Sequence, residues 1–200
     1  MSEKPHDITA QDVIRAVSPR IFWGAGDETF RRIITDSRAV EKGDLFVALK
    51  GKHHDGNDFA AEAAKKGASL VVERFTRAPA GSAVFVVSDT TRALMLLGAA
   101  NRRKTRATVF AVTGSSGKTT TKEMLACILK KRFNTLYAER SFNNYVGVSL
   151  TMLALSAEHE AAVFEIGTNS PGEVRDLAKL VRPDVGIITM VGSAHLAGFG

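Results

Sequence analysis

The residues with the clearest chemical potential form a short loop rich in glycine and serine, Gly114-Ser115-Ser116-Gly117-Lys118-Thr119-Thr120. A continuous apolar run, residues 108–112, precedes this loop, and a helical pattern follows it. A strand-to-helix turn of this kind presents backbone N–H groups to closely spaced phosphates, and glycine lets the backbone approach them. Lys118 would neutralise the β- and γ-phosphates of a nucleoside triphosphate, and the Thr119 hydroxyl would bind Mg²⁺. The pattern therefore predicts a loop that binds the phosphates of a nucleotide together with Mg²⁺.

The loop is shorter than the general motif G-x-x-x-x-G-K-[ST]. Val112 occupies the position of that motif's first glycine, and Gly114 stands three residues before Gly117. The alternative is a turn of small residues with a chance lysine. The strand and helix patterns on either side favour the phosphate-binding loop.

Two further side chains with metal-binding potential follow later strand-like segments. Glu165 ends the apolar run 161–164, and His195 comes after the run 185–190. Ligands of open parallel sheets bind outside the carboxyl ends of the strands. We therefore expect Glu165 to hold a metal, with an ordinary strand-end carboxylate as the alternative. His195 is a second candidate metal ligand, with a structural histidine as its alternative.

The elements that must position these residues divide the chain into two α/β parts. Short strand-like runs bounded by turn residues make up the first part, at 33–35, 45–49, 70–72 and 84–87. In the second part, strand and helix patterns alternate, which predicts a mostly parallel, doubly wound sheet. We predict a small N-terminal α/β domain over 1–88, a connecting helix within 89–106 and a nucleotide-binding domain over 107–200.

Two helices of the second part carry specific expectations. The helix after the loop has apolar residues that predict one buried face, namely Met124, Leu125, Ile128 and Leu129. Cys127 lies in the same pattern and is expected to fill the core. Further along, Ser170 and Glu173 predict a capping box, with Pro171 at the first helical position.

Composition and charge narrow the possible partners. The net charge is +6, from 27 Lys and Arg residues against 21 Asp and Glu residues, and the basic residues are scattered without interleaved aromatics. This pattern argues against a nucleic-acid partner. No apolar run approaches the ~18 residues of a membrane helix and no apolar leader opens the chain, so we expect no membrane insertion and a cytoplasmic location. The single cysteine excludes an intrachain disulfide.

Several separated motifs, in the same order along the chain, together resemble the Mur ligases. They are the loop 114–120, Ser141-Phe142-Asn143-Asn144-Tyr145-Val146-Gly147, Glu165-Ile166-Gly167 with Pro171-Gly172-Glu173, Ala194-His195-Leu196-Ala197-Gly198, Thr35-Asp36-Ser37-Arg38 and Gly43-Asp44-Leu45-Phe46-Val47-Ala48. The resemblance extends from about Ile33 to Gly200. It implies a uridine-nucleotide-binding N-terminal domain followed by a P-loop ATPase domain.

The resemblance also implies an activity, ATP-dependent amide-bond formation in peptidoglycan precursor synthesis. The implied substrates are UDP-N-acetylmuramoyl-tripeptide and D-alanyl-D-alanine. The γ-phosphoryl group of ATP would pass to the tripeptide carboxylate, and the dipeptide amine would then attack the acyl phosphate. Thr119 and Glu165 would hold one Mg²⁺ ion and His195 a second. Lys118, Glu165 and His195 would thus be the catalytic residues.

The remaining roles implied by the resemblance concern the two substrates. Asn143 and Asn144 would meet the nucleotide or metal-bound water through their amide oxygens. Asp36, Ser37 and Arg38 would face the uridine nucleotide, with the Arg38 guanidinium suited to a phosphate.

Mur ligases continue beyond the position that corresponds to Gly200, through the rest of the ATPase domain and a third domain. We therefore expect the 200-residue chain alone to show little or no ligase activity, and the full-length form to be a monomer. Two alternatives remain open. One is a sister Mur ligase that adds a single amino acid, which the segment Asn143-Asn144 disfavours. The other is a non-catalytic module that binds a UDP-sugar or a nucleotide.

Overall fold

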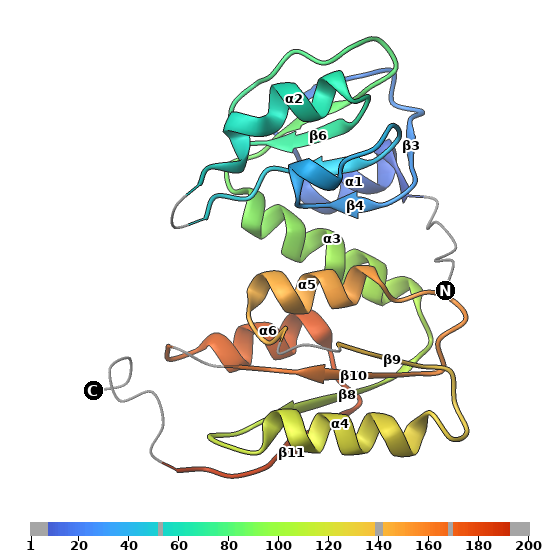
Figure 1. Ribbon diagram of the computed structural model, residues 1–200, viewed down its shortest axis with the longest axis vertical. Coiled ribbons are helices and arrows are strands. Elements are labelled where there is room, and N and C mark those ends of the chain that lie inside the picture. The colour runs from blue at the N-terminus through green and yellow to red at the C-terminus, as the bar shows by residue number, and fades with distance from the viewer. Residues whose placement is uncertain (1–7, 52–53, 139–141, 168–169, 193–200) are drawn as a thin grey trace. The chain divides into compact units, whose positions relative to one another are not determined.

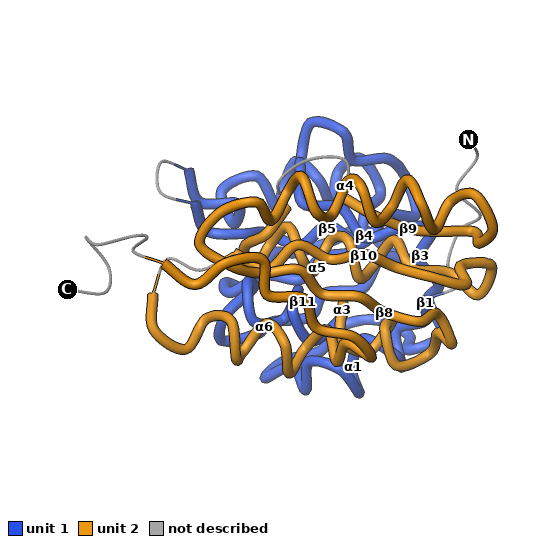
Figure 2. Tube along the Cα trace, turned by 90° about the horizontal axis from the view of Figure 1, so that it is seen from below, with its two compact units in different colours: residues 1–97 blue, residues 98–200 orange. Residues whose placement is uncertain are grey.

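The computed structural model describes residues 8–51, 54–138, 142–167 and 170–192. The chain divides into two compact units, residues 1–97 and 98–200 (Figure 2). Unit 1 contains a mixed five-stranded sheet and unit 2 a parallel four-stranded sheet. Helix α3 (Thr90–Lys104) contains the boundary between them (Figure 1).

Unit 1 is built on a five-stranded sheet in the order β2-β7-β6-β5-β4. These strands are β2 (Ile21–Trp23), β4 (Ile33–Ile34), β5 (Leu45–Val47), β6 (Ser69–Val72) and β7 (Val84–Val86). β4 to β7 run parallel, whereas β2 pairs antiparallel with β7. The carboxyl ends of β4, β5, β6 and β7 therefore lie at one edge of the sheet.

Short helices and a small ribbon complete unit 1. The elements are β1 (Ile8–Thr9) paired with β3 (Thr29–Phe30), α1 (Ala10–Val17), η1 (Ser37–Ala39), η2 (Gly56–Phe59) and α2 (Ala60–Lys65). α2 contributes three buried alanines, because a small side chain allows the helix to lie close to the sheet. They join Phe46 and Leu70 in the core of the unit.

Unit 2 is a four-stranded, all-parallel sheet in the order β11-β8-β10-β9. Its strands are β8 (Thr108–Thr113), β9 (Thr135–Tyr137), β10 (Ala161–Glu165) and β11 (Val185–Ile188). Its helices are α4 (Lys118–Leu129), α5 (Tyr145–Leu153) and α6 (Glu173–Val181). Figure 1 shows α4 on one face of this sheet and α5 and α6 on the other. The predicted α/β class with a parallel, doubly wound sheet is confirmed.

The predicted apolar face of α4 is only partly right. Leu125 and Leu129 pack beside the buried Ala126, but Met124 and Ile128 are 62% and 67% exposed. Cys127 is exposed as well, so its prediction as core filler is wrong. Consecutive helical residues point about 100° apart, so an apolar stripe at Leu125 and Leu129 turns the stripe beside it away from the sheet.

Helix α6 also begins later than predicted. Its first residue is Glu173, and Gly172 is the N-cap with a φ of +89° and no side-chain cap hydrogen bond. Pro171 therefore precedes the helix, and the predicted capping box at Ser170 is wrong. The backbone N–H of Glu173 instead donates to the carbonyl of Ser170 at 3.3 Å, which closes a turn before the helix. Among the described residues, none of the helices combines the length and apolarity needed to cross a bilayer.

Candidate functional site

The glycine-rich loop joins a central strand of unit 2 to a helix. It leaves β8, which lies between β11 and β10, and enters α4 at Lys118. Gly117 is the helix N-cap with a φ of +78° and carries no side chain that could cap the first turn. The first N–H groups of a helix carry partial positive charge and attract anions. The loop thus places a helix N-terminus at the carboxyl edge of the sheet.

The segment after β11 holds this loop in place. Thr189 donates its hydroxyl to the carbonyls of Thr113 (3.1 Å) and Ser116 (2.5 Å). The backbone N–H of Ser115 donates to the carbonyl of Met190 at 2.8 Å. A Cβ on Gly114, whose φ is +140°, would lie 2.2 Å from the Thr189 hydroxyl oxygen. Gly114 is therefore required by the close approach of this segment as well as by its own backbone conformation.

Two side chains of the loop make specific polar contacts. The Lys118 ammonium donates to the Gly114 carbonyl at 2.8 Å, so it lies over the loop. The Thr119 hydroxyl donates to Glu165 Oε2 at 2.9 Å. Glu165 is only 1% exposed, and its other oxygen, Oε1, accepts from the Asn143 side-chain amide at 2.9 Å. The structure thus brings together three predicted site residues, Thr119, Asn143 and Glu165, from three separate segments.

The two neighbouring asparagines differ in what their side chains do. Asn143 lies against Gly167, where a Cβ would come within 2.8 Å of the Asn143 amide carbon. Asn144 is the N-cap of α5, and its amide oxygen accepts from the backbone N–H of Gly147 at 2.9 Å. Asn143 therefore points its amide at Glu165, whereas the Asn144 oxygen is engaged at the start of a helix.

The donor set around Thr119 fits magnesium. A hydroxyl and a carboxylate are hard oxygen ligands, and Mg²⁺ commonly binds through one or two protein groups together with phosphates and water. Within the described part of the chain, no cluster of three or more His, Cys, Asp or Glu side chains could hold a metal ion. A metal here would thus be shared between Thr119, Glu165 and a nucleotide. His195, the other predicted ligand, lies outside the described residues.

Sequence reasoning missed a buried lysine beside this pair. Lys122 is 0% exposed, and its ammonium donates to the Ala138 carbonyl at 2.6 Å. The same nitrogen lies 3.0 Å from Glu123 Oε1 and 3.8 Å from Glu165 Oε2. Residues three and four apart share one face of a helix. The spacing of Lys122 from Lys118 and Thr119 was therefore the signal that could have found it.

The predicted substrate residues of unit 1 form an exposed ion pair. Asp36 follows β4, caps η1 and accepts from the backbone N–H of Arg38 at 3.0 Å. The Arg38 guanidinium also donates Nε to Asp36 Oδ1 (2.9 Å) and Nη2 to Oδ2 (2.7 Å). Hydrogen bonds from Arg38, first from its side chain, lower the pKa of Asp36 to about 2, and the pKa of Arg38 is raised. Ser37 lies between them and its carbonyl accepts from the Lys66 ammonium at 3.0 Å.

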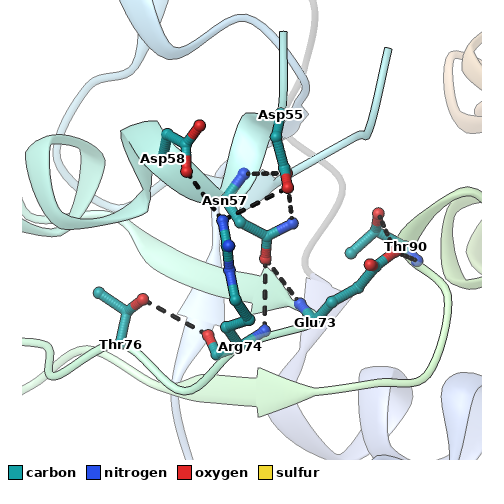
Figure 3. Close-up of polar contacts among 7 residues, drawn as sticks. All are labelled: Asp55, Asn57, Asp58, Glu73, Arg74, Thr76 and Thr90. Atoms are coloured by element: carbon teal, nitrogen blue, oxygen red, sulfur yellow. Dashed lines mark hydrogen bonds and ion pairs between the residues drawn. The ribbon is translucent and has the colours of Figure 1, made fainter. Parts of the chain in front are cut away.

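A second polar network lies at the same edge of the unit 1 sheet, after β5 and β6 (Figure 3). Asn57, only 8% exposed, accepts through its amide oxygen from the backbone N–H of Glu73 at 2.8 Å. Asp55 accepts from the backbone and side-chain N–H groups of Asn57 at 2.9 and 2.8 Å. Arg74 reaches Asp58 at 2.8 Å and Asp55 at 3.3 Å. These bonds tie the segment between β5 and α2 to the residues that follow β6.

Unit 1 also contains a cavity of about 760 Å³ that none of the predicted site residues lines. Its walls are residues 22–25, 27–29 and 80–82, which come from the end of β2, the loop that leads into β3 and the segment before β7. Because β7 begins where β4 to β6 begin, the cavity lies toward the amino ends of the parallel strands.

A parallel sheet with a glycine-rich loop at its carboxyl edge is the architecture of α/β nucleotide-binding domains. Comparison with known families agrees with this class. Residues 29–126 match the Mur ligase family catalytic domain, and residues 112–200 match the Mur ligase middle domain. The chain belongs to the Mur ligase family.

Individual relatives narrow the similarity. The chain is 42% identical over 175 residues to the UDP-N-acetylmuramoyl-tripeptide–D-alanyl-D-alanine ligase of Escherichia coli K12. The aligned region covers 87% of this chain and 38% of that relative. It resembles a crystal structure of MurF from Acinetobacter baumannii with a TM-score of 0.87 and 40% identity, over 96% of this chain and 43% of that one.

A further solved relative is MurF from Thermotoga maritima in complex with ADP. Its TM-score is 0.76 and its identity 38%, over 82% of this chain and 38% of that one. The chain thus spans about two fifths of the length of the relatives it matches.

Proposed function

We propose that the chain supplies the substrate-binding and nucleotide-binding parts of a ligase that joins D-alanyl-D-alanine to UDP-N-acetylmuramoyl-tripeptide with ATP. The observation that carries this proposal is the Thr119–Glu165 pair, 2.9 Å apart, directly after the glycine-rich loop of a Mur ligase family chain. Relatives at 42% and 38% identity are named for this reaction.

The chemistry explains why the loop and the pair occur together. A carboxylate is a poor electrophile, so its oxygen attacks the γ-phosphorus, ADP leaves and an acyl phosphate forms. The dipeptide amine then attacks the acyl carbon, phosphate leaves and the amine loses its proton. Both the carboxylate and the γ-phosphate are anionic, and preorganised positive groups lower the cost of bringing them together. Bound Mg²⁺ would supply part of that positive charge.

Each candidate site residue described in unit 2 has a defined role in this reaction. The loop N–H groups and the Lys118 ammonium bind the phosphates. Lys118 now contacts the neutral Gly114 carbonyl, and a phosphate offers it a stronger, charged acceptor. Thr119 and Glu165 would hold Mg²⁺ through their oxygens, and Asn143 orients the Glu165 carboxylate.

In unit 1, we assign the uridine nucleotide to Asp36, Ser37 and Arg38. Arg38 is 88% exposed, so its guanidinium can be reached by a ligand, and Asp36 holds it through two hydrogen bonds. A planar guanidinium held in this way is suited to a phosphate. The remaining features of the proposal are a cytoplasmic location, a monomeric full-length form and a second Mg²⁺ ion at His195.

The decisive experiment is an assay of ADP release by a full-length form of the protein, carrying either Lys118→Ala or Lys131→Ala. Lys131 is an exposed lysine after the end of α4 and is the matched control. Lys118→Ala should abolish ADP release that depends on both substrates, and Lys131→Ala should keep it. Turnover retained by Lys118→Ala would remove the phosphate-loop assignment.

The same assay separates the alternatives. Replacing D-alanyl-D-alanine by single amino acids should stop product formation. Turnover with a single amino acid would instead identify a sister ligase. Binding of UDP-N-acetylmuramoyl-tripeptide and ATP without any ADP release would indicate a non-catalytic binding module.

A further inference from the structure

A fully buried lysine lies behind the Thr119–Glu165 pair, on the same helix as the loop residues. The Lys122 ammonium is held by the Ala138 carbonyl at 2.6 Å and lies 3.0 Å from Glu123 Oε1. Ala138 directly follows β9, the strand that pairs with β10. Lys122 therefore connects α4 to the carboxyl ends of two adjacent strands.

Burying an ammonium is costly unless other charges and hydrogen bonds compensate for the lost water. Lys122 shares its helix face with Ala126, one turn later, and the buried Ala126 belongs to an apolar cluster with Val112 and Val163. An apolar side chain would fill the same space without that cost. The burial of a charged side chain here therefore indicates a functional role for the charge. The buried carboxylate nearest to the Lys122 ammonium is that of Glu165.

The contacts of the Glu165 carboxylate indicate what role the charge of Lys122 has. Oε1 accepts from Asn143, and Oε2 accepts from Thr119, each at 2.9 Å. Lys122 lies 3.8 Å from Oε2, which is too long for a hydrogen bond but short for two opposite charges in a dry environment. Both oxygens of the carboxylate are thus held from different sides.

We propose that Lys122 is a positioning residue that fixes the Glu165 carboxylate toward Thr119 and so prepares the pair for a magnesium–nucleotide complex. The geometry of this role stands on the contacts above, whereas its ligand rests on the proposed function. Within the Thr119–Glu165 pair, the Lys122 ammonium lies 3.8 Å from Glu165 Oε2. Its effect is exerted through Glu165.

Two opposite outcomes separate positioning from simple charge repulsion. A nearby ammonium repels a divalent cation, so a lysine without a positioning role would weaken magnesium binding, and its removal would strengthen it. A positioning lysine has the reverse effect. Loss of a group that orients a metal ligand commonly lowers metal affinity by about 10- to 100-fold.

The test is binding of ADP to the Lys122→Met chain by calorimetry, once with MgCl₂ and once with EDTA. Methionine keeps much of the length and the apolar stem but removes the charge. Affinity with MgCl₂ should fall about 10-fold or more, while affinity with EDTA should change much less. Lys131→Met, an exposed lysine near the same helix, should change neither. Unchanged or tighter binding with MgCl₂, or an equal loss in both buffers, would overturn the proposal.

A ligand-free measurement keeps the proposal testable if the protein binds no ADP or if Lys122→Met unfolds. Urea unfolding is measured for Lys122→Met, Glu165→Gln and the double variant. Lys122→Met alone should raise the unfolding constant about 100-fold or more, and far less when Glu165 is already Gln. Independent, additive effects of the two substitutions would exclude the coupling. A wild-type chain that binds no ADP would refute the proposed nucleotide site and leave this coupling measurable.

Discussion

Each unit places polar side chains at the carboxyl ends of its parallel strands, but these side chains are exposed in unit 1 and buried in unit 2. In unit 1, Asp36 and Arg38 are 46% and 88% exposed and hold mainly each other. In unit 2, Glu165 and Lys122 are 1% and 0% exposed and are tied to three segments. Exposed ion pairs contribute little to stability because water competes with them, whereas breaking a buried pair leaves a charge without compensation.

This difference suggests how each edge would recognise its ligand. A solvent-exposed guanidinium can adjust to a phosphate on a large, flexible substrate. A buried carboxylate held from several sides has a fixed orientation, as a reacting centre requires. Substitutions at the two edges should therefore differ greatly in their cost.

The largest expected effect comes from removing the buried carboxylate. Glu165→Ala takes the acceptor from Thr119 and Asn143 and leaves Lys122 with Glu123 as its neighbouring carboxylate. We expect the free energy of unfolding of unit 2 to fall by about 4 kcal/mol. Circular dichroism in urea would measure it, and Asp36→Ala is the matched change at the exposed edge.

The single tryptophan makes the comparison specific to each unit. Trp23 lies in unit 1, so its fluorescence follows that unit while circular dichroism follows both. Glu165→Ala should shift the circular dichroism transition to lower urea, whereas Asp36→Ala should move neither signal appreciably. Similar losses in the two variants would mean that burial does not separate the two edges.

A smaller effect is expected from two loop glycines with positive φ. A Cβ on Gly114 would lie 2.2 Å from Thr189, whereas a Cβ on Gly81 of unit 1, at a φ of +86°, would meet nothing within 4 Å. Gly81→Ala should cost only the backbone strain, about 1 kcal/mol, and Gly114→Ala about 3 kcal/mol because a clash is added. Urea unfolding measures both, and equal costs would mean that the segment after β11 can move aside.

The sequence predicted those parts of the site that depend on chain order. A strand, a glycine-rich loop and a helix occur in direct succession, so β8, the loop and α4 could be placed without the fold. Glu165 could be expected at the same edge, because it ends another strand of a parallel sheet. The family and the fold class predicted from these patterns are confirmed. The roles of the individual site residues remain predictions.

The sequence could not show which side of each helix faces the sheet. Met124 and Ile128 have the same i, i+4 spacing as Leu125 and Leu129, and only packing decides between the two stripes. A lysine in a helical pattern is normally assigned to the surface, so the burial of Lys122 could not be predicted from the sequence. The sequence likewise could not show that Asn143 contacts Glu165 while Asn144 caps a helix, because this difference depends on where α5 begins.

The smallest expected effect concerns the exposed pair and is seen best as a titration. The pKa of Asp36 is about 2, below its ordinary value of 3.8, chiefly because of hydrogen bonds from Arg38. Because the folded state has the lower pKa, the pair's contribution to stability is complete above about pH 3.8 and is lost as the pH falls through about 2. Arg38→Gln should therefore lower the melting temperature slightly at pH 6 and by much less at pH 2.

Nuclear magnetic resonance of the Asp36 carboxyl carbon tests the cause directly, with Arg74→Gln as the control. In Arg38→Gln the pKa of Asp36 should rise toward 3.8 but stay below it, because the backbone N–H of residue 38 still donates. The pKa of Asp55 is lowered mainly by hydrogen bonds from Asn57 and only secondarily by the charge of Arg74. Arg74→Gln should therefore leave the pKa of Asp55 low. A large rise there would mean that the charge of the Arg74 guanidinium, and not the hydrogen bonds from Asn57, governs the pKa of Asp55.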